Sequence, residues 1–257
     1  MKLKTPMPTN APMLKPTQIH RTLTAATLTL TGLLAACGGG GGGDTSGPTI
    51  DPTQLKGRWV TAAGVTPATT AVVVPDANGA ANAWLLAQDA SRLVKLVVKS
   101  DSSANGKSYA LGQGNVAGQA VAGQVTTALA ASPKSIAFTG LNTGTLTQSD
   151  TLATPAVQAD VVGNWSATSG GSAQTMQWSL NTTGSMTGTS TTGCTYAGSV
   201  AAIASTAAYS VSFSESCADG NKTAFNGVGT LNAAKNGLTV VVTSADETRG
   251  AAVFFVK

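Results

Sequence analysis

The segment 209–216, Tyr-Ser-Val-Ser-Phe-Ser-Glu-Ser, alternates between larger side chains and serines. Successive side chains of a β-strand point to opposite faces of the sheet, so this pattern is typical of an antiparallel strand with one buried and one solvated face. The segments 175–180 and 94–99 show the same period of two, in Thr-Met-Gln-Trp-Ser-Leu and Val-Lys-Leu-Val-Val-Lys. No long stretch carries apolar residues at helical spacing, and the sequence therefore predicts an all-β protein.

Turn signals rich in Gly, Asn and Asp divide the second half of the chain into about eight short strands. These strands are expected to begin near Val162, Gln174, Gly184, Cys194, Ala208, Thr223, Leu238 and Gly250. The first half contains a similar number of candidates. Eight short strands suit an up-and-down barrel, because closure removes exposed sheet edges. The sequence thus predicts two small antiparallel β-barrels in tandem, with a two-sheet sandwich as the alternative.

The two halves also begin alike. Leu55-Lys56-Gly57-Arg58-Trp59 starts one half, and Val162-Gly163-Asn164-Trp165 starts the other. Downstream, Trp84 and Tyr109 are interpreted as loose counterparts of Trp178 and Tyr196. We therefore expect a first β domain at 55–150, a linker at 151–160 and a second β domain at 161–257.

The first 36 residues have the composition of an export signal. They carry basic residues and no acidic residue, and an uncharged stretch with several leucines runs from 22 to 36. This stretch is too short to span a bilayer, which needs roughly 20 apolar residues. Behind the signal peptide at 1–36, the glycine run at 38–43 predicts a flexible tether over 37–54.

The signal ends in Leu34-Ala35-Ala36-Cys37, and there the chain resembles the lipobox of bacterial lipoproteins. The resemblance implies cleavage after Ala36 and acylation of Cys37, whose partner is then membrane lipid. Gly38 stands where an aspartate would imply inner-membrane retention, so the resemblance implies the outer membrane, on its periplasmic or its surface face. The alternative is an ordinary secretory signal, in which Cys37 is a chance residue.

Charge and histidine content exclude several function classes. Four of the 15 Lys and Arg residues precede Cys37, so the mature chain carries 11 basic against 11 acidic side chains and has no basic cluster. Nucleic-acid binding is therefore not expected. The one histidine, His20, lies in the signal, which leaves the mature chain without histidine-based catalysis or the usual zinc ligands. Asp246 and Glu247 fall at a predicted turn, where carboxylates are usually solvated. We expect no cofactor, no metal and no enzymatic activity.

Cys194 and Cys217 are expected to form a disulfide, because an exported chain meets an oxidising compartment. Two free buried cysteines are the alternative. If 194 faces 217, the same hairpin register pairs Tyr196 with Glu215, Gly198 with Phe213, and Val200 with Val211. These residues all belong to the inward parity of their strands.

The tryptophans are candidate ligand contacts or barrel-floor residues. Gly57-Arg58-Trp59 and Gly163-Asn164-Trp165 resemble the Gly-x-Trp of lipocalin-like barrels, in which the tryptophan closes the floor and packs against an arginine near the C-terminus. The resemblance implies this floor role for both tryptophans, with Arg249 as the arginine for Trp165. Trp84 and Trp178 have apolar neighbours of the same parity and are predicted to pack inside the barrels.

The C-terminal segments Gly237-Leu238-Thr239-Val240 and Ala251-Ala252-Val253-Phe254-Phe255 resemble the last two strands of small periplasmic metalloprotease inhibitors. Those are also eight-stranded barrels with one disulfide. Three functions are therefore open. The leading hypothesis is a lipid-anchored, non-enzymatic structural or interaction module of the cell envelope, with an envelope protein as partner. A barrel that binds a small apolar ligand and a protease-inhibitor-like barrel are the alternatives.

Overall fold

A computed structural model describes residues 49–257 apart from 63, 67, 113–116, 142, 151–152 and 169–174. The signal, the lipobox with Cys37 and most of the tether lie outside the described residues, and the predictions about them stay predictions. Within the described part, no helix is both long enough and apolar enough to cross a membrane.

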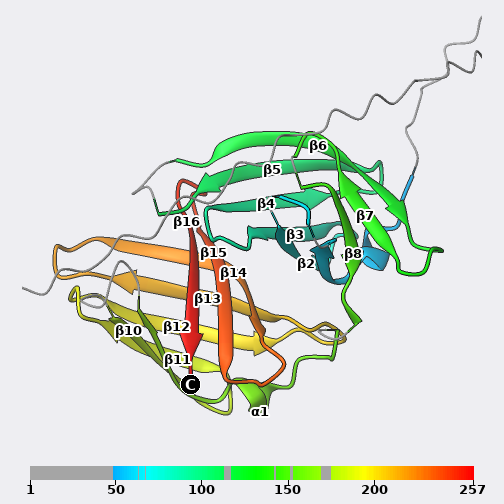
Figure 1. Cartoon of the computed structure of the whole chain (residues 1–257). Helices are drawn as coiled ribbons and strands as arrows, with labels where there is room; N and C mark the ends of the chain where they lie inside the picture. Colours follow the sequence, from blue (N-terminus) through cyan, green and yellow to red (C-terminus); the bar gives the residue numbers. More distant parts are fainter. Residues whose placement is uncertain are drawn as a thin grey trace, which may run out of the picture. The chain divides into compact units, whose positions relative to one another are not determined.

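The described residues form two closed barrels of eight antiparallel strands, which belong to one compact unit (Figure 1). Barrel 1 consists of β1 (Gly57–Thr61), β2 (Thr69–Pro75), β3 (Ala81–Ala87), β4 (Arg92–Val98), β5 (Ser103–Ala110), β6 (Gln119–Ala128), β7 (Ser135–Phe138) and β8 (Thr145–Gln148). Barrel 2 consists of β9 (Gly163–Thr168), β10 (Thr175–Leu180), β11 (Ser185–Ser190), β12 (Thr195–Ala202), β13 (Tyr209–Ser216), β14 (Lys222–Leu231), β15 (Gly237–Ser244) and β16 (Gly250–Val256). Each barrel closes by pairing its first strand with its last.

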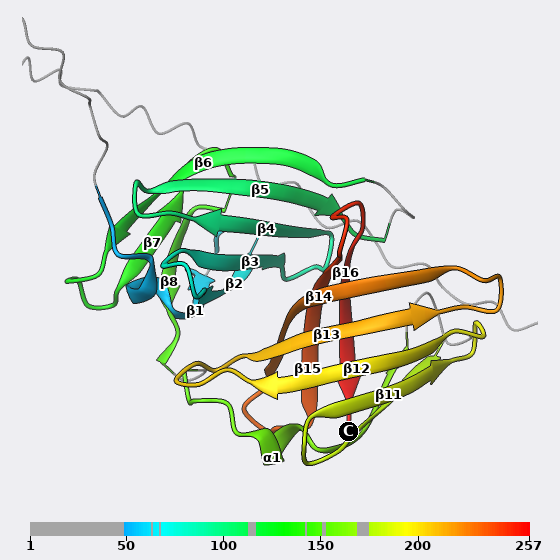
Figure 2. The same ribbon diagram turned by 180° about the vertical axis from the view of Figure 1, so that it is seen from behind.

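This topology confirms the predicted tandem barrels, and the sandwich alternative is wrong. Each of the eight strands of barrel 2 begins within one residue of its expected start. Figure 2 shows β11 to β14 side by side, in the order in which they follow one another in the chain. Such meander pairing needs only short turns, which is why the turn signals of the sequence locate the strands so closely.

Each barrel starts with one turn of helix that meets a tryptophan. These turns are η1 (Pro52–Leu55) and α1 (Gln158–Val161). The indole N–H of Trp59 donates to the carbonyl of Leu55 at 2.8 Å, and that of Trp165 donates to the carbonyl of Val161 at 2.7 Å. Both tryptophans are fully buried. The same hydrogen bond at the same offset shows that the two barrels share one entry structure.

The glycine of each Gly-x-Trp is explained by its backbone conformation. Gly57 has φ +135° and Gly163 has φ +126°, a region that side chains with a Cβ rarely adopt. The entry to barrel 1 also includes residues that the sequence assigned to the tether. The backbone N–H of Ile50 donates to the carbonyl of Ser100 at 2.8 Å, and Pro52 is buried. Residues from Ile50 onward therefore belong structurally to barrel 1.

Seven aromatic side chains occupy the interior of barrel 2. They are Trp165, Trp178, Tyr196, Tyr209, Phe213, Phe225 and Phe255. Trp178 lies at their centre, with ring centroids 4.4 Å from Phe255 and 5.2 Å from Phe213. Such close tilted and edge-on contacts contribute beyond the burial of apolar area. Barrel 2 thus has a core made largely of its own aromatic rings.

The interior of barrel 1 is built mainly from aliphatic side chains and alanines. Its buried cluster comprises Leu55, Trp59, Ala71, Val73, Ala81, Ala83, Leu85, Val94, Leu96, Val98, Ala104, Val125, Ile136, Phe138 and Leu146. On β3 the interior positions are Ala81, Ala83 and Leu85, so Trp84 between them points outward.

The inward prediction for Trp84 is therefore wrong. β3 is apolar on both faces, and alternation alone cannot say which face is inside. The proposed counterparts are wrong as well. Trp84 lies on the third strand of its barrel and Trp178 on the second, while Tyr109 lies on the fifth and Tyr196 on the fourth. Only the entry segments and the barrel topology repeat.

Cys194 and Cys217 are joined as a disulfide in barrel 2. Between them, the β12–β13 register pairs Tyr196 with Glu215, Gly198 with Phe213, and Val200 with Val211. This is the predicted register. A slip by one residue would turn every large side chain of β13 to the solvent, so the alternation excludes that slip, and the cysteine pair selects this register.

Candidate functional site: the groove between the barrels

The outer faces of the two barrels meet through a buried apolar cluster, here called the junction. Barrel 1 contributes Val72, Val74, Trp84, Leu93 and Tyr109, and barrel 2 contributes Ala208, Val228 and Val241. Only 5% of Trp84 and none of Tyr109 is exposed. Burial of these large side chains removes apolar surface from water, which makes the junction a stabilising contact between the barrels.

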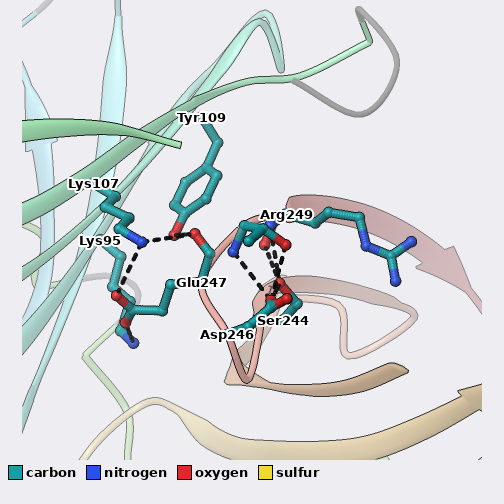
Figure 3. A network of polar contacts seen from close by, with 8 residues as sticks. Lys95, Lys107, Tyr109, Ser244, Asp246, Glu247 and Arg249 are labelled. Carbon is teal, nitrogen blue, oxygen red and sulfur yellow. Dashed lines mark hydrogen bonds and ion pairs between the residues drawn. The ribbon is translucent and has the colours of Figure 1, made fainter. Parts of the chain in front are cut away.

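A polar contact holds the β15–β16 turn of barrel 2 against β4 and β5 of barrel 1 (Figure 3). The carboxylate of Glu247 lies 2.6 Å from the Lys95 ammonium and 3.9 Å from that of Lys107. The Glu247 backbone carbonyl accepts hydrogen bonds from Lys107 at 3.1 Å and from the Tyr109 hydroxyl at 3.2 Å. Glu247 lies at a turn, as predicted, yet its charge is paired across the junction.

The backbone of Gly250 lies directly against the ring of Tyr109. A Cβ at position 250 would lie 2.5 Å from the Tyr109 Cγ atom, closer than real Cβ contacts. Glycine is therefore required here by close approach. Burial, followed by the negative charges of Glu247 and Asp246, raises the pKa of Tyr109 to about 12. The close approach of Gly250 places the Tyr109 ring in direct contact with barrel 2.

Beside the junction the two outer faces separate and leave a groove of about 340 Å³. The walls come from β1, β2 and β3 of barrel 1 and from β14, β15 and β16 of barrel 2. The lining residues are Arg58, Thr70, Val72, Trp84, Leu86, Gln88, Val228, Thr230, Thr239, Val241 and Phe254. Phe254 is 50% exposed, which is unusual for so large an apolar side chain. The groove is thus an apolar cleft of ligand size with one cation in its lining.

That cation is Arg58, which lies next to the floor tryptophan in sequence but points to the outside of barrel 1. Its Nη1 donates to the carbonyl of Leu231 in barrel 2 at 3.2 Å. Its Nε is buried and has no hydrogen-bond partner among the described residues. Burial lowers the pKa of the Arg58 guanidinium. A partly desolvated guanidinium with an unsatisfied N–H can bind an anion.

The remaining candidate site residues are positioned as follows. Trp59 and Trp165 lie at the helical entries of their barrels, and Trp178 lies inside barrel 2. The implied contact between Arg249 and Trp165 is wrong. The Arg249 guanidinium lies over the ring of Phe225, 5.2 Å from its centroid, and hydrogen-bonds Thr223. The ammonium of Lys257 lies 5.0 Å from the Trp165 ring centroid instead.

In the described part, one cluster of side chains has the residue types that bind metal ions. Cys194, Glu215 and Cys217 come together, but the two sulfurs are bonded to each other and offer no thiolate.

Two further hollows lie on barrel 2. A shallow hollow of about 490 Å³ lies at β9, β10 and β11 and is lined mainly by neutral polar side chains. A smaller one of about 150 Å³ lies beside α1. Neither contains an unpaired buried charge like that of Arg58.

Sequence reasoning did not find the groove. In the sequence, Arg58 belongs to a floor motif and Phe254 to a terminal strand, and neither pattern predicts a shared site. The available signal was the loss of alternation in apolar runs such as 71–74 and 240–242. Continuous apolar strands are buried on both faces, which implies that something covers the outside of each barrel.

The chain was also compared with known proteins. No protein-family model, no curated protein and no solved structure matches it.

Proposed function

We propose that this protein is a non-enzymatic, lipid-anchored module of the bacterial cell envelope that acts through the outer surface of its two barrels. The observation that carries the proposal is that both interiors are occupied by the chain's own side chains, aromatic in barrel 2 and mostly aliphatic in barrel 1. A barrel with a packed interior works as a rigid support, and its contacts must be made from outside.

The anchor and the two-barrel body fit such a role. Several acyl chains on Cys37 would make membrane attachment stable, since each buried methylene contributes about 0.8 kcal/mol. The Glu247 contact and the junction fix the two outer faces to each other. The groove with Arg58, Trp84 and Phe254 then offers a defined binding surface at a fixed place on the body.

The filled interiors weigh against the alternative of a lipocalin-like ligand barrel. In barrel 2, Trp178 touches both Phe213 and Phe255, where an enclosed ligand would have to lie. The protease-inhibitor alternative draws support only from its eight-stranded barrel, and a shared fold does not imply a shared function.

The test has two parts. Mass spectrometry of the N-terminal peptide should find an acylated Cys37, and Cys37→Ser should release the protein from membranes. An intact signal peptide or an unmodified Cys37 would overturn the anchor.

The second part locates the interaction surface in cells. A photoreactive amino acid at Phe254 should form adducts with an envelope component. The same amino acid at the exposed outer position Ser199 on β12 should form none. Equal labelling from both positions would contradict a specific surface at the groove.

A further inference from the structure

We propose that the groove between the barrels binds a small amphiphilic molecule that carries one carboxylate, with the carboxylate on Arg58 and the apolar part along Trp84, Leu86 and Phe254. This goes beyond the envelope-module function and does not depend on the lipid anchor. It assigns a ligand class to a site outside both barrels.

The carboxylate of the proposed ligand is assigned to Arg58 because the charge of this side chain is unpaired. Among the described residues, ion pairs join Lys95 and Lys107 to Glu247 and Lys235 to Asp160, and none includes Arg58. The carbonyl of Leu231 accepts one hydrogen bond from Nη1 but carries no net charge to offset the guanidinium. A carboxylate is planar and can accept two parallel N–H bonds from one edge of a guanidinium. Paired with the guanidinium in this way, it would neutralise the charge of Arg58, which no ion pair of the described residues offsets.

The ligand's charge follows from the lining. Arg58 is the one charged side chain among the residues that line the groove, and the other polar members, Thr70, Gln88, Thr230 and Thr239, are neutral. One guanidinium balances one negative charge. A phosphate monoester carries about two and would leave one of them unpaired in an apolar cleft. A monoanionic carboxylate is therefore the better match.

The apolar part of the ligand follows from the walls. Val72, Trp84, Leu86, Val228 and Val241 line the groove together with the half-exposed ring of Phe254. An alkyl chain or an aromatic body placed there would cover apolar surface that water now contacts. The volume of about 340 Å³ is at the lower end of the range for small-molecule sites. This favours a small molecule over a polymer.

The experiment uses the full chain with Cys37→Ser, so that no covalent lipid competes for the site. Isothermal titration calorimetry is run with decanoate, with 1-decanol as the same chain without charge, and with acetate as the same charge without a chain. Decanoate should bind saturably with one molecule per chain and more tightly than either of the others. Equal affinity for decanoate and decanol, or no saturable binding of decanoate, would overturn the proposal. Decyl phosphate is a further arm, and tighter binding than decanoate would overturn the choice of a carboxylate.

Two variants test the position. Arg58→Gln should weaken decanoate binding about 10- to 100-fold, the usual value of charge-assisted hydrogen bonds, and leave decanol binding unchanged. The matched control is Arg92→Gln, an arginine of barrel 1 outside the groove lining, which should change neither. Undiminished decanoate binding by Arg58→Gln would overturn the assignment.

The second variant does not touch the guanidinium. Thr239→Phe keeps a strand-forming residue on β15 and fills the groove with a ring, so decanoate binding should be lost while the far-ultraviolet circular dichroism spectrum stays unchanged. This variant keeps the proposal testable if Arg58→Gln does not fold. Wild-type decanoate affinity in a folded Thr239→Phe protein would show that the ligand binds elsewhere.

Discussion

Barrel 1 and barrel 2 have the same strand topology and the same helix-to-tryptophan entry, but they distribute their aromatic side chains differently between interior and outer face. In the described part, barrel 2 holds seven aromatic residues in its interior cluster and barrel 1 holds two, Trp59 and Phe138. The large aromatic residues Trp84 and Tyr109 of barrel 1 lie on its outside, at the junction. One topology therefore accommodates two different cores.

The difference separates two sources of stability. Barrel 2 has its own aromatic packing and a disulfide, which act within the barrel. Barrel 1 has an interior of smaller side chains, and its largest outer ones, Trp84 and Tyr109, are buried in the junction with barrel 2. We infer that barrel 1 depends on the junction for part of its stability and that barrel 2 depends on it less. The following changes test this, from the largest expected effect to the smallest.

Trp178→Ala should lower the unfolding free energy of barrel 2 by about 3–5 kcal/mol, the usual cost of removing a buried tryptophan. The ring is 1% exposed and touches Phe213 and Phe255, so no neighbour can fill the space without leaving its own contacts. Denaturant unfolding followed by near-ultraviolet circular dichroism measures the change. Trp178→Phe, which keeps a ring, should cost clearly less. A loss below about 1 kcal/mol in the alanine variant would contradict the aromatic core.

Removing the disulfide should cost barrel 2 about 3 kcal/mol, the chain-entropy value for a loop closed over a sequence separation of 23. The change is the double variant Cys194→Ala with Cys217→Ala, and barrel 1 should be affected only through the junction. Comparing unfolding with and without reductant gives the measurement. The reductant should destabilise the wild type and leave the double variant unchanged. A similar loss in both would show that the reductant acts elsewhere.

Gly250→Val should force the barrels apart, because a Cβ at this position overlaps the ring of Tyr109. Overpacking of this kind costs about 1–3 kcal/mol. The loss should fall mainly on barrel 1, seen as faster hydrogen exchange in β4 and β5 and as greater acrylamide quenching of Trp84. Ala224→Val, which adds bulk at an exposed position of β14, is the control. Unchanged exchange in β4 and β5 would contradict the dependence of barrel 1 on the junction.

High pH should weaken the junction through Tyr109. Its pKa is raised from 10 to about 12 in the folded protein, so its contribution to stability is fully present below pH 10 and is lost as the pH rises through 12. Tyr209 of barrel 2 is shifted likewise, with burial as the main cause, and serves as the comparison. Unfolding free energies measured across this range should fall less in Tyr109→Phe than in the wild type. Identical pH profiles would mean that Tyr109 is not the titrating group.

Glu247→Gln should have the smallest effect, about 0.2–1 kcal/mol, because the pair with Lys95 is partly solvated. The wild type should lose this contribution in high salt, whereas the variant should show a weaker salt dependence. Asp219→Asn, in an exposed turn of barrel 2, is the control for removing a charge. A larger loss in the control than in Glu247→Gln would show that the ion pair does not support the junction.

Much of the fold was predictable because strand alternation and turn chemistry are local. The β12–β13 register followed from the expected Cys194–Cys217 pair, and the shared parity of Tyr209, Val211 and Phe213 agrees with it. The direction of Trp84 was not predictable, because both faces of β3 are apolar. The groove was not predictable either, since Arg58 and Phe254 belong to opposite ends of the chain and no local pattern connects them.

The sequence by itself determined which segments form strands, how neighbouring strands pair and where each barrel begins, because these depend on residues close together in the chain. Tertiary structure decided which outer face of each barrel is buried in the junction. It also decided which charged side chains form ion pairs and which do not. Glu247 finds Lys95 only when the barrels meet, and Arg58 loses water there without gaining a carboxylate. Burial and charge pairing between distant segments depend on their separation in space, which no local sequence pattern encodes.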